Sequence, residues 1–214
     1  MIAAGNLQAK IVTGIKHNYY LDGSQIVAET WTQSEIDYLL YYLYDEKGAP
    51  LGMRYRTSDY EAGVFDTFFF EKNASGDIIA IYNSTEKKIG TYKYDAWGNC
   101  TFMIRSNINS LENLIVSRYN PFRYRGYYYD YETGFYYLQS RYYNPEWGRF
   151  LNADGYVSTG TGMLGYNMFA YCNNNPVMFT DPAGDFPFLI IGVIAAVIVG
   201  ASLAACQTPP REET

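Results

Sequence analysis

The five-residue unit Tyr-Asp-x-x-Gly constrains this chain more than any other feature of its sequence. It occurs at residues 44–48 and 94–98, and a degenerate copy at residues 70–82 lies between them. Related units begin at Tyr129 and Tyr143. Tyrosine ends a strand and packs on its cross-strand neighbour, aspartate starts a turn, and glycine accepts backbone angles that other residues avoid. Units that return at intervals of about 25 residues predict a series of long hairpins.

The tyrosine content favours the same fold class. The chain has 24 tyrosines among 214 residues, and aromatic side chains pack well on a half-buried sheet but are weaker helix formers. Because an isolated hairpin is only marginally stable, the repeated units are expected to share a sheet. We therefore predict a mainly β protein of antiparallel hairpins, with room for one large domain or two small units.

Charge and residue types argue against several kinds of site. The net charge of −6 leaves no basic surface for a nucleic acid. The three cysteines, Cys100, Cys172 and Cys206, have no CxxC spacing, which argues against a disulfide framework or a zinc site. His17 is the single histidine, so neither a His-based metal cluster nor a Ser-His-Asp triad is expected. We expect no cofactor and no bound metal.

Turn-forming residues predict where the first strands end. Asp22-Gly23 marks one hairpin, and a tight connection at residues 45–48 joins two further strands. The β pattern weakens at residues 107–120, where one helical turn is expected before Pro121. We place an internal boundary between residues 119 and 120.

The β pattern returns after this boundary. Strands are predicted at residues 122–129 and 135–143, with a turn at 130–134, a turn at 144–148 and a short strand from Arg149. Apolar residues at spacings typical of a helix then predict a short helical piece over residues 164–172.

The segment from Asn120 to Gly184 also carries a long, ordered motif. It reads NP-x-RYRG-x-YYD-x-ETG-x-YYL-x-x-RYYNP-x-x-GRF-x-x-AD and later NNNP-x-x-x-x-DPAG. This motif resembles the Rhs repeat-associated core of the Rhs polymorphic toxins, and the upstream units resemble the YD repeats of that family. The resemblance covers residues 19–184 and implies that the repeats form part of a spiral β-shell. Residues 120–185, hereafter the plug segment, would then close the shell ahead of a variable toxin domain.

The resemblance further implies a self-cleaving site of the aspartyl type. Its positions fall on Arg141, Asp154 and Asp181, and the bond cut would follow Gly184. Two close carboxylates cannot both ionise easily, so one can keep a proton while the other activates water. An arginine beside them would keep the base ionised. The alternative is that both aspartates are ordinary turn residues.

Two positions depart from the family pattern. Gly155 follows Asp154 where proline is frequent, and Asp185 stands at the junction where a bulky apolar residue is frequent in members that cleave. Asp185 brings a third negative charge, which opposes a shared proton between the other two carboxylates.

Residues 186–206 form an apolar stretch without a charged side chain. A helix of about 20 residues spans the hydrocarbon core of a bilayer, so this stretch is predicted to be a hydrophobic helix that either crosses a membrane or packs within the shell. Residues 207–214 are predicted to be a disordered tail, too short for a toxin. No secretory signal opens the chain, so a fragment or orphan of a longer secreted or cell-surface protein is expected.

Three functions remain open from the sequence. The leading one is a structural delivery module, the C-terminal part of an Rhs shell that encloses or presents a toxin, here without the toxin. The second is an autoprotease that releases the C-terminal segment. The third is a membrane-anchored protein that binds a partner through its aromatic sheet, although packing alone accounts for the tyrosines. Expected partners are the missing N-terminal shell or a second copy, because an unfinished spiral leaves an unpaired strand edge, and toxin and immunity proteins in the complete system.

Overall fold

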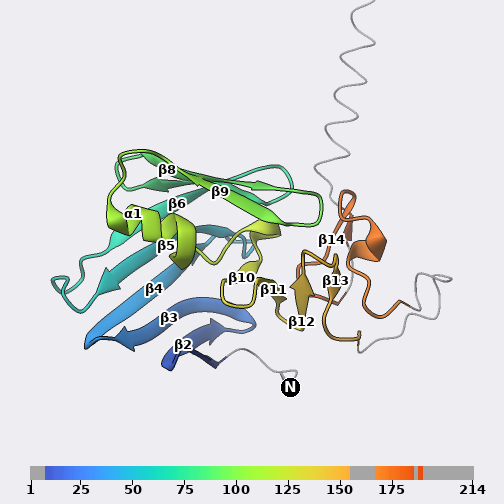
Figure 1. Cartoon of the computed structure of the whole chain (residues 1–214), viewed down its shortest axis with the longest axis horizontal. Coiled ribbons are helices and arrows are strands. Elements are labelled where there is room, and N and C mark those ends of the chain that lie inside the picture. The colour runs from blue at the N-terminus through green and yellow to red at the C-terminus, as the bar shows by residue number, and fades with distance from the viewer. Residues whose placement is uncertain (1–7, 155–166, 186–187, 190–214) are drawn as a thin grey trace, which may run out of the picture.

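A computed structural model of the chain describes residues 8–154, 167–185 and 188–189 (Figure 1). Its largest element is a nine-stranded antiparallel sheet in which neighbours follow the order of the chain. The sheet curves from β2 to β8 and β9, so that one face is concave (Figure 1). Its strands are β1 (Ala9–Val12), β2 (Ile15–Asp22), β3 (Gln25–Gln33), β4 (Ile36–Tyr44), β5 (Pro50–Thr57), β6 (Asp66–Lys72), β7 (Ile78–Asn83), β8 (Lys88–Tyr94) and β9 (Cys100–Ile104). The predicted series of hairpins is confirmed.

One turn chemistry recurs along this sheet. The side-chain oxygens of Asp45, Asn73 and Asp95 each accept the backbone N–H groups of the residues two and four positions later, at 2.8–3.0 Å. Asn83 does the same at 3.0–3.1 Å, although its turn has no glycine and Glu86 takes the left-handed backbone angle instead, with φ +60°. The degenerate repeat at residues 70–82 is thus confirmed, and the turn after Asn83 is an additional copy that the glycine-based motif did not identify.

A short helical segment lies within the curve of the sheet (Figure 1). It consists of α1 (Ser110–Leu114) and a π-helical turn, η1 (Ile115–Tyr119), and a capping box at Asn109 satisfies its first backbone donors. Val116 packs so closely on β8 that a Cβ added to Gly90 would lie 2.5 Å from its Cγ1. The predicted helical turn before Pro121 is confirmed and is about twice as long as expected.

The plug segment forms a second, four-stranded antiparallel sheet beside the first. Two strand predictions were wrong in detail: the strand at 135–143 is broken at Gln139-Ser140, and a 3-10 turn, η2 (Tyr124–Gly126), delays the first strand to Tyr128. The helix predicted over residues 164–172 is absent from its described part: Met168 and Phe169 form a turn, Ala170 makes an isolated β-bridge with Arg149, and a 3-10 turn, η4 (Cys172–Asn174), follows. The strands are β10 (Tyr128–Asp130), β11 (Phe135–Leu138), β12 (Arg141–Asn144) and β13 (Arg149–Phe150), with β14 (Phe179–Thr180) pairing with β15 (Phe188–Leu189).

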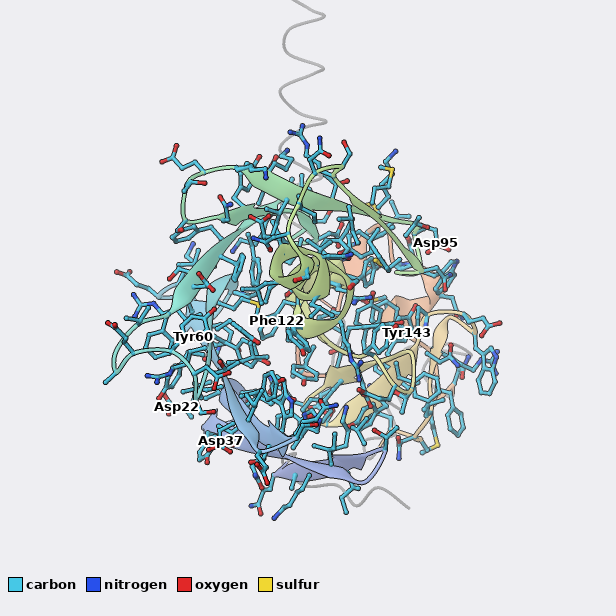
Figure 2. All side chains as sticks on the ribbon, turned by 60° about the vertical axis from the view of Figure 1, so that its left-hand side comes forward. Asp22, Asp37, Tyr60, Asp95, Phe122 and Tyr143 are labelled. Carbon is cyan, nitrogen blue, oxygen red and sulfur yellow. The ribbon has the colours of Figure 1, made fainter. Side chains whose placement is uncertain are left out.

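Aromatic side chains join the plug segment to the concave face. Phe122 lies at the centre of the molecule (Figure 2), edge-on to Tyr42 of the sheet with ring centroids 5.0 Å apart. Three buried plug hydroxyls donate to one backbone turn of the sheet: Tyr124 to Ala96 O at 2.8 Å, Tyr136 to Gly98 O at 2.9 Å and Tyr143 to Trp97 O at 2.6 Å. The plug is therefore held by directional bonds as well as by apolar burial.

Predictions for the C-terminal region fall largely outside the described residues. Of the apolar stretch at 186–206, which was predicted to be a helix, only residues 188–189 are described, and the prediction is wrong there because they form strand β15; the tail at 207–214 lies outside the described part. Among the helices that are described, none has the length and apolar character needed to cross a membrane.

Candidate functional site

The five residues singled out by the sequence lie together at one end of the plug segment. Arg141 is the first residue of β12, Asp154 follows β13, and Asp181 follows β14. The pairing of Leu138 with Arg141 closes a tight turn at the tip of the β11–β12 hairpin. Hydrogen bonds from this tip to Ala183 O and Gly184 O bring the junction against it.

Arg141 links the two carboxylates. Its Nη2 lies 3.1 Å from Asp154 Oδ2 and 3.6 Å from Asp181 Oδ2. The residue is 6% exposed, and its guanidinium stacks over the Phe150 ring with Cζ 3.7 Å from the centroid. Its Nη1 donates to Met168 O at 3.3 Å. A buried guanidinium with these contacts is fixed in position and oriented toward both acids.

The two carboxylates occupy different environments. The Asp181 side chain is 2% exposed and that of Asp154 is 18% exposed. Burial raises the pKa of Asp181 above its usual range, although Arg141 and the backbone N–H groups of Gly184 and Asp185 oppose this shift. Burial also lowers the pKa of Arg141, against the pull of the surrounding carboxylates. Asp181 therefore holds a proton more readily than an ordinary aspartate does.

Both sides of the peptide bond between Gly184 and Asp185 are held by this group of residues. The carbonyl oxygen of Gly184 accepts hydrogen bonds from Arg141 Nε and, at 2.9 Å, from Ser140 Oγ. On the nitrogen side, the Asp185 N–H donates to Asp181 Oδ1 at 3.0 Å. The carbonyl oxygen thus faces donors that can stabilise negative charge, and a carboxyl group lies within hydrogen-bonding distance of the nitrogen.

Backbone contacts that the sequence did not indicate complete the site. Met168 O accepts from the Asp154 N–H at 2.8 Å as well as from Arg141, so one carbonyl positions both residues. Tyr127 OH accepts from the Asp181 N–H at 3.1 Å and bonds Thr180 Oγ1 at 2.9 Å. No local pattern marks Met168 or Tyr127 for this task, because both act through contacts between distant parts of the chain.

The single histidine is engaged elsewhere, in the large sheet. His17 Nδ1 is 2.7 Å from Glu29 Oε1 on the neighbouring strand of the large sheet. Within residues 8–154, 167–185 and 188–189, no group of three or more His, Cys, Asp or Glu side chains is arranged to hold a metal ion.

Comparisons with known proteins point to toxins. The chain is 38% identical over 187 residues to the tRNA nuclease WapA of Bacillus subtilis, a match that covers 87% of this chain and 7% of the relative. A tRNA3(Ser)-specific nuclease WapA of Bacillus spizizenii is 37% identical over the same lengths. The toxin protein Tse5 of Pseudomonas aeruginosa is 42% identical over 77 residues, which are 36% of this chain and 6% of that protein. The chain thus spans a small part of each of these relatives.

Solved structures share the fold. The TcdB2-TccC3 complex superimposes with a TM-score of 0.59 at 23% identity, over 79% of this chain and 8% of that chain. The same complex without its hypervariable C-terminal region gives the same values. No family model matches the chain. These relatives support the resemblance of the chain to the Rhs polymorphic-toxin family. The nine-stranded sheet and the plug segment therefore share their fold with a part of the TcdB2-TccC3 complex.

Proposed function

We propose that this chain is the C-terminal part of an Rhs shell that encloses or presents a toxin domain, and that its plug segment cuts the chain after Gly184. The toxin relatives and the shared fold support the delivery role. A shell that releases its content must separate the toxin from the wall. A single cut at the end of the plug segment would do so. In this proposal residues 1–119 form the wall and residues 120–185 the closure.

The cleavage proposal rests on hydrogen bonds to both sides of the peptide bond after Gly184. Arg141 donates to its carbonyl oxygen, and Asp181 accepts from its N–H. Donors aimed at a carbonyl oxygen stabilise the charge that forms there when a nucleophile adds. A carboxyl beside the nitrogen can protonate the leaving amine.

The proposed reaction is an addition of water followed by loss of the amine. The Asp154 carboxylate takes a proton from water, and the water oxygen bonds to the Gly184 carbonyl carbon, whose π electrons move to the carbonyl oxygen. When this electron pair re-forms the carbonyl π bond, the bond to the Asp185 nitrogen breaks, and the nitrogen receives the proton of the Asp181 carboxyl. The products are a new C-terminus at Gly184 and a new N-terminus at Asp185. Arg141 pairs with the Asp154 carboxylate at 3.1 Å and shares the oxyanion charge.

A chain with a C-terminal tag tests this proposal. We expect loss of the tag, with mass spectrometry placing the new N-terminus at Asp185. Asp154→Asn and Asp181→Asn should each lower the first-order cleavage rate by roughly 100-fold or more, in line with the loss of general acid or base catalysis.

Asp59→Asn is the matched control, because Asp59 is an exposed aspartate in the connection between β5 and β6. It should cleave at the parental rate. An intact parent chain, or equal cleavage in the parent and both site variants, would exclude this mechanism.

A further inference from the structure

Ser140 occupies the tip of the β11–β12 hairpin, directly against the junction. The turn closes without glycine, and Gln139 takes the left-handed backbone angle, with φ +60°. The Ser140 N–H donates to Leu138 O at 2.6 Å and to Ala183 O at 3.3 Å. These bonds fix the position of the serine relative to the chain on either side of the proposed cut.

The hydroxyl of Ser140 lies between two carbonyl oxygens. Its Oγ is 2.7 Å from Ala183 O and 2.9 Å from Gly184 O. A hydroxyl has one proton, so it cannot donate fully to both oxygens at once. In the uncleaved chain the proton is therefore divided between a carbonyl that does not react and one that does.

We propose that Ser140 is a catalytic residue that, with Arg141, forms a two-donor oxyanion hole for the Gly184 carbonyl oxygen. This inference rests on the cleavage proposed above. When water adds to the carbonyl carbon, Gly184 O becomes an alkoxide, while Ala183 O stays a neutral amide oxygen. The hydroxyl proton then turns wholly to Gly184 O, because a charged acceptor forms the stronger bond. A bond that strengthens as charge develops lowers the barrier without tightening the ground state.

The position of Ser140 distinguishes this role from that of a nucleophile. Its Oγ is at hydrogen-bonding distance from the carbonyl oxygen, which also accepts from Arg141 Nε. The histidine that could activate a serine is engaged with Glu29 in the large sheet. Ser140 also does not titrate near neutral pH, so it should affect the rate and leave the pH profile unchanged.

Three variants of the tagged full chain test the inference. Ser140→Ala removes the donor and should slow cleavage roughly 100-fold to 1,000-fold, the usual effect of losing one oxyanion-hole donor. Ser140→Thr keeps a hydroxyl at an exposed position and should recover the rate to within about tenfold of the parent. Ser84→Ala is the control, because Ser84 is exposed in the turn between β7 and β8.

The readouts separate the two proposals. Ser140→Ala should keep the parental pH profile and unfolding temperature, which a merely structural defect would change. Parental cleavage by Ser140→Ala would overturn the role of Ser140 and leave self-cleavage in place. A Ser140→Thr variant as slow as Ser140→Ala, with an unchanged unfolding temperature, would also overturn it. A parent chain that stays intact would overturn both proposals together.

Discussion

At the scale of single residues, Gly184 occupies a position that leaves no room for a side chain. Its φ is +75°, and an added Cβ would lie 2.8 Å from both Leu138 O and Ser140 Oγ. A side chain there must strain the backbone and push the junction away from the hairpin tip. Gly184→Ala should therefore lower the cleavage rate at least about tenfold and cost about 1–3 kcal/mol of stability, measured by tag loss and by chemical denaturation.

Gly63→Ala provides the matched control for this prediction. Gly63 has φ +81°, but an added Cβ would meet nothing within 4 Å. The Gly63→Ala variant therefore has the backbone strain without a steric clash, and it should cleave at the parental rate. Equal cleavage rates in the two variants would show that close approach at Gly184 is not needed.

The raised pKa of Asp181 predicts a pH dependence at the same scale. Because the folded state holds this proton more tightly than the unfolded chain, the contribution of Asp181 to stability falls as the pH rises from the unfolded toward the folded pKa. The protonated acid proposed for cleavage is lost over the same range. Cleavage should therefore slow as the pH rises above the usual ionisation range of an aspartate. A rate that increases steadily with pH would contradict the assignment of Asp181 as the acid.

The family motif placed Arg141, Asp154 and Asp181, and the structure brings their side chains together. Their catalytic roles remain predictions. Ser140 could not be identified in the same way, because one hydroxyl in a tyrosine-rich strand pattern has no signature of its own. Its position depends on a turn that contacts Ala183, more than forty residues later in the chain.

At the scale of elements, local chemistry determined what could be predicted. The hairpin turn at Asp45 was recognisable because its aspartate bonds its own backbone and Gly48 accepts φ +79°. The turn at Gln139-Ser140 was missed because neither residue is a typical former of so tight a turn. There, bonds to the junction segment stabilise a left-handed glutamine. Long-range contacts overrode local preference in that turn.

Docking of the plug segment on the turn after Asp95 gives a prediction about stability. Tyr136 is fully buried, and its hydroxyl donates to Gly98 O at 2.9 Å. Tyr136→Phe leaves that carbonyl without its donor and should cost about 1–3 kcal/mol, measured by chemical denaturation. Tyr41→Phe is the comparison, because Tyr41 is 44% exposed on β4 and should change stability by less than about 0.5 kcal/mol. Equal losses of stability in the two variants would show that the hydrogen bond of the Tyr136 hydroxyl does not stabilise the docking of the plug segment.

At the scale of the whole molecule, the large sheet is open at both ends. In the described part of the chain, β1 pairs only with β2, and β9 pairs only with β8. Apolar side chains are exposed on these edge strands, with Ile11 74% exposed on β1 and Met103 50% exposed on β9. An edge with unpaired backbone groups and apolar side chains readily accepts another strand. In the shell wall proposed above, each of these edges would pair with a further strand.

This open edge predicts self-association of the isolated chain. Sedimentation velocity should show oligomers that increase with concentration. Met103→Lys places a charge on the β9 edge and should shift the population toward the monomer, because edge lysines oppose strand pairing. Val64→Lys is the matched control, since Val64 is a similarly exposed apolar residue, 47% exposed, in the connection between β5 and β6. The Val64→Lys variant should associate as the parent chain does. A parent chain that stays monomeric at high concentration would contradict an open shell wall.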